Sequence, residues 1–204
     1  MNEDEHLSHE DRVELLGDAK QDAEWLVRMV ENLLSITRIS GSEQTNIEKS
    51  PELIEEILGE CIANFKKRNS DVNLKVTIPD EPLMVNVDAM LIEQVIMNLL
   101  DNAAKHAEGM TELRLDVKCS GSRALVSVAD DGAGLDPAII PVLFRGQIDP
   151  ADGKSYDSNR FRGIGLATCQ AIVTAHGGTI SAANRPEGGA VFSFTIPLEE
   201  EKEE

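Results

Sequence analysis

The spacing of apolar residues changes along this chain, and that change limits the folds open to it. Between residues 88 and 106, apolar side chains recur every three or four positions, which is typical of one face of a helix. Between residues 113 and 118 they alternate with polar ones, Gly121 and Ser122 supply a turn, and residues 124–129 return, which predicts a β-hairpin. No strand–helix–strand rhythm follows, so we expect a two-layer α/β sandwich with a largely antiparallel sheet.

A helix with a bundle-type seam is predicted ahead of this sandwich, over residues 11–40. Such a seam needs a partner helix. Gly41 and Ser42 end the helix, and residues 41–50 are expected to be a linker. The apolar residues of the seam are separated by alternating steps of three and four, the spacing of coiled coils and helical bundles: Leu16, Ala19, Ala23, Leu26, Val30 and Leu33.

The other elements are predicted from turn and cap residues. Ser50 and Pro51 have the residue types favoured at a helix start, so a helix is expected to begin at Pro51. The rest, in chain order, are strands at residues 74–78 and 84–87, a helix at 166–175 that ends at His176-Gly177-Gly178, and a last hairpin of residues 179–183 and 190–196.

Charge and composition exclude several classes of function. The net charge is -18, with 37 acidic against 19 basic residues, so binding to nucleic acid or to an anionic membrane surface is disfavoured. Residues 1–10 and 199–204 are expected to be acidic, solvated tails. The three cysteines form no CxxC pair, which indicates neither a zinc site nor a disulfide framework. No stretch is apolar enough to span a membrane, so we expect a cytoplasmic fragment.

One polar line runs along the predicted helix of residues 88–106. Asn98, Asn102, Lys105 and His106 share one side of the helix because they are spaced by four, seven and eight positions. Asparagine is a modest helix former, so two of them on one side need a reason. An amide oxygen can bind Mg²⁺ and lysine can neutralise phosphate, which suggests a Mg²⁺–phosphate site. An ordinary exposed helix face is the alternative.

Two glycine-containing clusters add to this line. Asp130-Asp131-Gly132-Ala133-Gly134 directly follows a predicted strand, where a carboxylate can accept a hydrogen bond from an exocyclic amine such as that of adenine. Gly163-Ile164-Gly165-Leu166 opens a helix, where free backbone N–H groups favour an anion. Each cluster alone also fits a plain turn or a tight loop.

Together and in this order, the three clusters resemble the N, G1 and G2 boxes of sensor histidine kinase catalytic domains, within the superfamily shared with gyrase, Hsp90 and MutL. Residues 98–106 resemble the N box, Asp130-x-Gly132-x-Gly134 resembles G1, and Gly163-x-Gly165-Leu166 resembles G2. Leu143-Phe144 is similar to the F box. The resemblance implies a Bergerat-type ATP-binding fold over residues 51–198, with a mostly antiparallel sheet and helices on one face.

The resemblance also implies roles. Asn102 would coordinate Mg²⁺, Lys105 would contact the terminal phosphates, and Asp130 would bind the adenine amine. Residues 144–162 would form an ATP lid whose candidate phosphate contacts are Arg145, Lys154, Arg160 and Arg162. The implied catalytic residues are Asn102 and Lys105, and the implied nucleotide-binding residues are Asn98, Asn102, Lys105, His106, Asp130, Gly132, Gly134, Phe144, Arg162, Gly163, Ile164, Gly165 and Leu166.

Departures from the pattern refine the class. ATPase branches of the superfamily place a glutamate where this chain has Asn98, so we expect slow hydrolysis and a phosphoryl group kept for transfer. Phe161 stands where the G2 box often has a further glycine, which leaves the conformation of the lid open. A serine kinase of the anti-sigma type and a non-catalytic nucleotide-binding dimerisation scaffold are the alternatives.

Residues 11–40 resemble the second helix of the dimerisation and phosphotransfer region. Ser8-His9-Glu10 looks like a phospho-acceptor box, but Val13-Glu14 follows where the family has Thr-Pro. We therefore expect no phospho-acceptor histidine in this chain and no autophosphorylation. Residues 22–34 and 88–95 are most similar to KdpD-type potassium-responsive kinases, which implies a parent protein anchored in the bacterial membrane.

The resemblance implies a reaction and a set of partners. The γ-phosphoryl of Mg²⁺-bound ATP would pass to a histidine on the missing dimerisation helix, and then to an aspartate of a response-regulator receiver domain. Whether the N-terminal helix pairs with a second copy in a homodimer is open. The sequence does not identify the signal or the regulator.

Overall fold

The structure is a computed structural model that describes residues 47–145 and 162–199. It also describes scattered helical positions between residues 12 and 37, here called the N-terminal helical segment. Expectations for residues 1–11, 38–46, 146–161 and 200–204 lie outside the described part of the chain.

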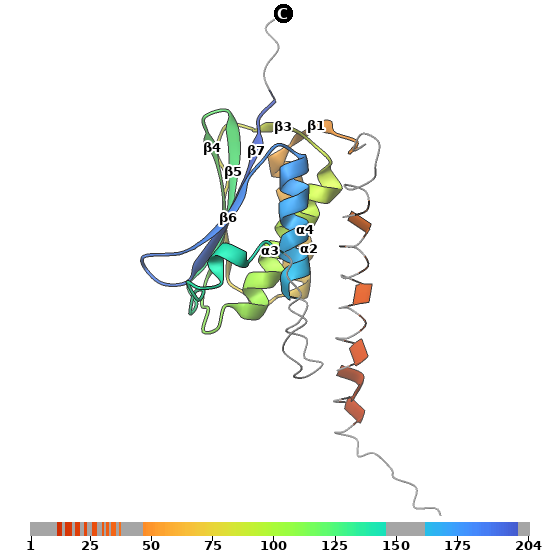
Figure 1. The fold of residues 1–204 in the computed structure, drawn as a ribbon, viewed down its shortest axis with the longest axis vertical. Coiled ribbons are helices and arrows are strands. Elements are labelled where there is room, and N and C mark those ends of the chain that lie inside the picture. The colour runs from red at the N-terminus through yellow and green to blue at the C-terminus, as the bar shows by residue number, and fades with distance from the viewer. Residues whose placement is uncertain are drawn as a thin grey trace, which may run out of the picture.

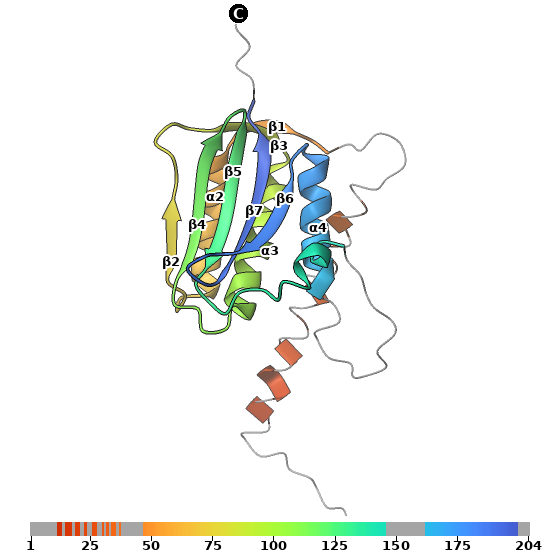
Figure 2. The same cartoon turned by 60° about the vertical axis from the view of Figure 1, so that its left-hand side comes forward.

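A five-stranded sheet forms one layer, in the order β2-β4-β5-β7-β6 (Figure 2). β2 pairs with β4 in parallel, and the other pairs are antiparallel. Both predicted hairpins, β4–β5 and β6–β7, are therefore confirmed, and so is the largely antiparallel sheet. The strands are β2 (Leu74–Thr77), β4 (Leu113–Ser120), β5 (Arg123–Asp130), β6 (Ile180–Asn184) and β7 (Ala190–Pro197).

Three helices cover one face of this sheet (Figures 1 and 2): α2 (Ile54–Arg68), α3 (Ala89–His106) and α4 (Arg162–Ala175). α3 lies between the other two and packs against both. A short 3₁₀ helix, η1 (Ile140–Val142), follows β5. The expected two-layer sandwich with helices on one face is confirmed.

The core between the layers is mostly aliphatic, in keeping with an aromatic content of 3%, and includes the buried Phe65, Phe192 and Phe194. Apolar residues of α3 are buried at spacings of one, three and four, and Leu113, Leu115 and Val117, every second residue of β4 up to Val117, are buried with them. Each fully buried Leu, Ile or Val contributes roughly 1.5–3 kcal/mol to stability. The buried residues of α3 are Leu91, Ile92, Val95, Ile96, Leu99, Leu100 and Ala103.

Two helix starts differ from expectation. Ser50 and Pro51 do not open a helix: Ser50–Leu53 is strand β1, which pairs with β3 (Met84–Val87), and α2 begins at Ile54. The pairing with a strand more than thirty residues away overrides the local helix-start signal. α4 begins at Arg162, so Gly163 and Gly165 belong to its first turn rather than to a preceding loop.

The N-terminal helical segment lies against the helical layer through polar side chains. Ser35 Oγ donates to Gln94 Oε1 of α3 at 2.6 Å. Asn32 Oδ1 accepts from Gln94 Nε2 at 3.0 Å and from Asn98 Nδ2 at 3.4 Å. Figure 1 shows the segment running alongside the helices, on the side away from the sheet.

The described residues of the predicted seam face solvent instead of the sandwich. Leu16 is 71% exposed, Leu26 53% and Val30 56%. The polar residues Asn32 and Ser35 are the buried ones, at 8% and 7% exposure. The segment therefore contacts its own domain through its polar side and leaves an apolar stripe for another partner.

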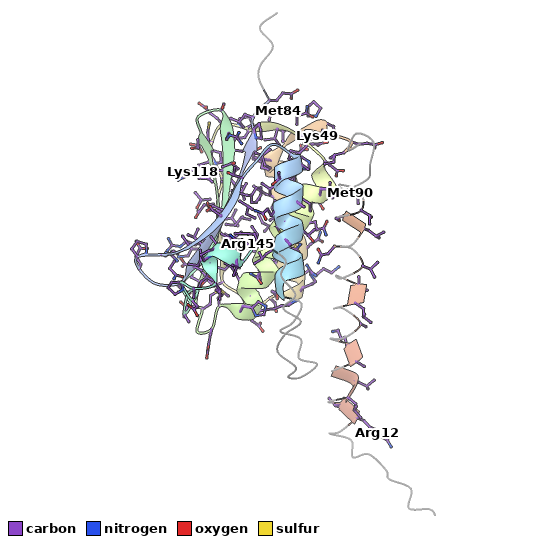
Figure 3. The ribbon with its side chains drawn as sticks, viewed as in Figure 1. Arg12, Lys49, Met84, Met90, Lys118 and Arg145 are labelled. Atoms are coloured by element: carbon purple, nitrogen blue, oxygen red, sulfur yellow. The ribbon has the colours of Figure 1, made fainter. Side chains whose placement is uncertain are left out.

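His176 joins the end of α4 to the start of α3. It is 3% exposed, and its Nδ1 lies 2.8 Å from the Ile172 carbonyl, which can only accept a hydrogen bond. Its Nε2 accepts from the backbone N–H of Asp88 at 3.1 Å, so the neutral tautomer with a proton on Nδ1 is required. Figure 3 shows Lys49 at the same end, where its Nζ donates to the Ala175 carbonyl.

This contact predicts a loss of stability in mild acid. Burial, with a smaller contribution from nearby Lys49, lowers the pKa of His176 below its ordinary value. The neutral form is favoured in the folded state, so its contribution is complete above about pH 6.5 and falls as the pH drops below that value. Urea unfolding at pH 7.5 and 5.5 should show a smaller loss of unfolding free energy for His176→Asn than for the wild type. Equal losses would contradict this interpretation.

Candidate functional site

The four polar residues predicted to share one side of α3, Asn98, Asn102, Lys105 and His106, all lie in that helix. Asn98 and Asn102 are partly buried, whereas Lys105 and His106 are exposed in the last turn. Asp88 caps the start of the helix by accepting from the Leu91 N–H at 3.2 Å. The line therefore leads from the covered middle of α3 to its open C-terminal end.

α3 and α4 run antiparallel, which sets what lies opposite Asn102. Asp88 at the start of α3 meets His176 at the end of α4, and Cys169 Sγ lies 4.0 Å from the Val95 carbonyl in the middle. Burial raises the pKa of Cys169 to about 12, partly offset by a hydrogen bond with Asn98. One turn onward along α3 from Asn98 is Asn102, and one turn back along α4 from Cys169 is Gly165. The structure thus brings Asn102 level with Gly165.

Asp130 is the buried carboxylate at the end of β5, with 4% exposure. Its Oδ1 accepts from the Gly132 N–H at 2.9 Å and from the Ala190 N–H at 3.2 Å. Among the described residues no group donates to Oδ2. The carboxylate is therefore held by one oxygen, and the other keeps its capacity to accept a hydrogen bond.

Asp131, the next residue, has a different place. It is exposed and accepts from the backbone N–H and Oγ1 of Thr111 and from the Glu112 N–H, at 2.8, 2.5 and 2.9 Å. These hydrogen bonds, that from Thr111 Oγ1 foremost, lower the pKa of Asp131 to about 2. Asp131 therefore fixes the loop to the residues just before β4.

The loop that follows lies directly on the C-terminal end of α3. The Ala133 N–H donates to the Glu108 carbonyl at 3.0 Å. A Cβ on Gly132 would lie 3.0 Å from the backbone of Ala107, a tight contact, and Gly134 has φ +80, so both positions favour glycine. The loop after Asp130 and the end of α3 are thus in direct contact.

The segment after the loop places an aromatic side chain against the sheet. Phe144 meets Phe192 of β7 edge to face, with ring centroids 6.4 Å apart. Figure 2 shows η1 close to the start of α4, at the same end of the molecule as the end of α3. Arg145, labelled in Figure 3, is exposed just beyond Phe144.

Other predicted residues are described only in part. Leu166 is buried, at 6% exposure, behind the first turn of α4. Lys154 and Arg160 lie outside the described residues. Arg162, Gly163 and Ile164 are described only as helical backbone.

These residues fit a magnesium-bound nucleotide. Among the described residues, no group of three or more His, Cys, Asp or Glu side chains could hold a metal ion. Mg²⁺ commonly takes few protein ligands and several phosphate oxygens, so one amide oxygen at Asn102 suits it. A Cβ on Gly165 would meet no described residue within 4 Å, which allows a ligand to approach the backbone of the first turn of α4 closely.

Gly165 therefore provides a test that separates binding from folding. Gly165→Ala should leave stability unchanged or raise it by up to about 1 kcal/mol, because alanine is the better helix former. A methyl group beside the first-turn N–H groups should weaken Mg²⁺-ADP binding about tenfold or more, which is ~1.4 kcal/mol. Calorimetric titration and urea unfolding measure the two effects.

Gly59→Ala is the matched control for this prediction. Gly59 lies in α2, and its added Cβ also meets nothing within 4 Å. This variant should gain stability in the same way and bind nucleotide as the wild type does. If Gly165→Ala binds nucleotide as tightly as the wild type does, the first turn of α4 is not part of the binding site.

Sequence reasoning missed three residues that support the site. Asn184 and Arg185, in the last hairpin, hydrogen bond the backbone of Leu135 and Asp130 respectively. Asn32 accepts the amide of Asn98. An asparagine at the end of a strand, such as Asn184, is usually interpreted as part of a turn. Its contact with the distant Leu135 becomes apparent only from the three-dimensional structure.

One end of the two-layer sandwich brings together a buried carboxylate, a glycine-containing loop and the ends of two helices. This arrangement is typical of a nucleotide-binding domain. The family described as "Histidine kinase-, DNA gyrase B-, and HSP90-like ATPase" matches residues 87–200, and the chain belongs to this family. The resemblance inferred from the three boxes is thereby confirmed.

Curated relatives are sensor kinases. The chain is 38% identical over 195 residues to the sensor protein KdpD of Clostridium acetobutylicum, covering 96% of this chain and 21% of the relative. It is 38% identical over 171 residues to the KdpD of Escherichia coli, covering 83% and 18%. The similarity to KdpD-type kinases is confirmed, and the chain spans about a fifth of the length of these relatives.

Solved structures of histidine kinases share the fold. The catalytic domain of ThkA superposes with a TM-score of 0.62 at 24% identity, covering 74% of this chain and 96% of that one. The Acinetobacter baumannii kinase AdeS gives 0.67 at 20% identity, covering 95% and 87%. Full-length ShkA, solved with AMPPNP, gives 0.68 at 22% identity, covering 96% and 40%. Within the described residues of our chain, no helix is both long enough and apolar enough to cross a membrane.

Proposed function

We propose that this chain binds Mg²⁺-ATP where α3, the start of α4 and the loop after β5 meet, and passes the γ-phosphoryl group to a histidine. The observation that carries this proposal is the state of Asp130. Asp130 is only 4% exposed, and one of its carboxylate oxygens accepts hydrogen bonds from two backbone N–H groups. The other oxygen has no donor among the described residues, so it can accept a hydrogen bond from a single exocyclic amine. Adenine carries such an amine.

In this proposal each element has a separate task. Asn102 offers its amide oxygen to Mg²⁺, which when bound neutralises phosphate charge, and Lys105 contacts the terminal phosphates. The first turn of α4 supplies backbone N–H groups. The remaining residues, which shape the pocket or close it over the nucleotide, are Asn98, His106, Gly132, Gly134, Phe144, Arg162, Gly163, Ile164, Gly165 and Leu166.

Position 98 favours transfer over hydrolysis. A water molecule attacks phosphate faster when a carboxylate can take its proton. The Asn98 amide instead donates to Asn32 and interacts with the Cys169 thiol. An amide does not act as a base at neutral pH, so we expect slow hydrolysis and retention of the phosphoryl group for an acceptor.

The partners follow from the relatives. We infer that the acceptor histidine lies on a dimerisation helix that packs against the seam of the N-terminal helical segment, and that a response-regulator aspartate takes the phosphoryl next. The exposed Leu16, Leu26 and Val30 also suit a second copy of the chain. Potassium or osmotic sensing, and a membrane-anchored parent protein, are proposed from the likeness to KdpD.

The test of this proposal is phosphoryl transfer in trans. The chain, Mg²⁺ and ATP labelled at the γ-phosphate are incubated with a helical hairpin from the Clostridium acetobutylicum relative that carries its acceptor histidine. We expect acid-labile label on the hairpin and none on a version with that histidine replaced by alanine. Label on serine would support an anti-sigma-type kinase, and nucleotide binding without transfer would support a scaffold.

A further inference from the structure

We propose that Asn184 is a positioning residue for adenine recognition: it fixes the far end of the loop of residues 131–136 beside Asp130. This inference rests on the proposed function. Asn184 Oδ1 accepts from the Leu135 N–H at 2.7 Å, and Asn184 Nδ2 donates to the Leu135 carbonyl at 2.7 Å. One side chain thus binds both backbone groups of a single loop residue.

The place of Asn184 in the sheet explains this contact. β6 is an edge strand, and Asn184 is its last residue. The side-chain amide has the same donor and acceptor pair as a peptide group, so it receives Leu135 as a neighbouring strand would. The loop is therefore attached to the sheet without being a strand.

The attachment continues to Asp130 through short steps. Asn184 pairs with Ala190 across the β6–β7 hairpin, and the Ala190 N–H donates to Asp130 Oδ1. The next residue, Arg185, donates from its guanidinium to the Asp130 carbonyl at 2.6 Å. The turn end of the last hairpin therefore holds both the carboxylate and the loop that follows it.

The loop is held at every second residue, and each contact comes from a different part of the fold. Asp131 is bound by residues 111 and 112, Ala133 by Glu108, and Leu135 by Asn184. Gly132 and Gly134 lie between these contacts. A Cβ on Gly134 would approach Asn184 Oδ1 to 2.9 Å, which shows how closely the side chain lies on the loop. Such preorganisation lowers the ordering cost of binding a flat base.

Two variants test whether both hydrogen bonds of the Asn184 side chain are needed. Asn184→Ala removes both hydrogen bonds, and Asn184→Asp keeps an acceptor for the Leu135 N–H but loses the donor to its carbonyl. We expect Mg²⁺-ADP affinity to fall about fivefold to 30-fold in Asn184→Ala, and by a similar factor in Asn184→Asp. Asn73→Ala is the control, because Asn73 is an exposed asparagine beside the opposite edge strand, β2.

The decisive readout is discrimination between bases. Calorimetric titrations with Mg²⁺-ADP and Mg²⁺-GDP give the ratio of the two affinities for each variant. A positioning role predicts that the ratio falls in both Asn184 variants and is unchanged in Asn73→Ala. Equal losses for both nucleotides, or no loss, would overturn the inference. Failure of the wild type to bind Mg²⁺-ADP would overturn the proposed function instead.

Discussion

Asp130→Asn is expected to lower Mg²⁺-ADP affinity about 100-fold or more while the chain still folds. The asparagine oxygen can keep the hydrogen bonds from the Gly132 and Ala190 N–H groups. Its NH₂ group, however, takes the place of the carboxylate oxygen that would accept from the base. Two hydrogen-bond donors, this NH₂ group and the exocyclic amine of adenine, would then face each other. An unpaired buried donor and the lost charge-assisted bond together cost ~3 kcal/mol. Calorimetry with Mg²⁺-ADP measures this loss.

Asp131→Asn is the matched control for this experiment. Asp131 is a neighbouring carboxylate whose described partners are Thr111 and Glu112, just before β4. Its lowered pKa means that its contribution is present above about pH 4 and is lost as the pH falls towards 2. Asp131→Asn should therefore reduce the dependence of stability on pH in acid and leave nucleotide affinity within about threefold of the wild type. Equal binding losses in the two variants would refute the separate roles.

Gly189→Ala should destabilise the fold more than its neighbouring substitution, Gly188→Ala. Both glycines have positive φ, +81 and +103, where an L-residue costs about 1–2 kcal/mol. A Cβ on Gly189 would also lie 2.1 Å from the Asp130 carbonyl oxygen, whereas one on Gly188 meets nothing within 4 Å. We expect a loss of about 1–2 kcal/mol for Gly188→Ala and more than about 4 kcal/mol for Gly189→Ala.

Urea unfolding followed by circular dichroism measures both losses. Because the Asp130 carbonyl cannot move without moving the carboxylate, Gly189→Ala should also lose nucleotide affinity at temperatures where it remains folded. Gly188→Ala should bind as the wild type does. Similar stability of the two variants would mean that the last hairpin lies farther from Asp130 than described.

The elements with a clear local period were predictable. α3 and the two hairpins follow from spacing alone, because one face of each is buried in a single core. β1 could not be read locally: Ser50 and Pro51 carry a helix-start signal, and only their pairing with β3, after α2 and β2, makes them strand. Long-range pairing of this kind leaves no mark in a short window of sequence.

The candidate site was predictable where chemistry and pattern agree. Alternation along β5 buries Ala124, Val126 and Val128, and continuing it selects Asp130 rather than Asp131 as the inward carboxylate. Asn184 and Asn32 act through neighbours that are distant in sequence, so residue type alone could not assign them. The seam of the N-terminal helical segment was predicted, but not that its polar side would meet α3.

The most direct test of a single nucleotide site is paramagnetic broadening by Mn²⁺-ADP in an amide NMR spectrum of the chain. Manganese takes the place of magnesium and broadens signals of nearby backbone groups. We predict broadening of Asn102, Gly132 and Gly165, on three separate elements, with Met84 of β3 and Lys118 of β4, at the opposite end of the molecule (Figure 3), unaffected. Broadening confined to one of the three elements, or centred on α2, would contradict the account.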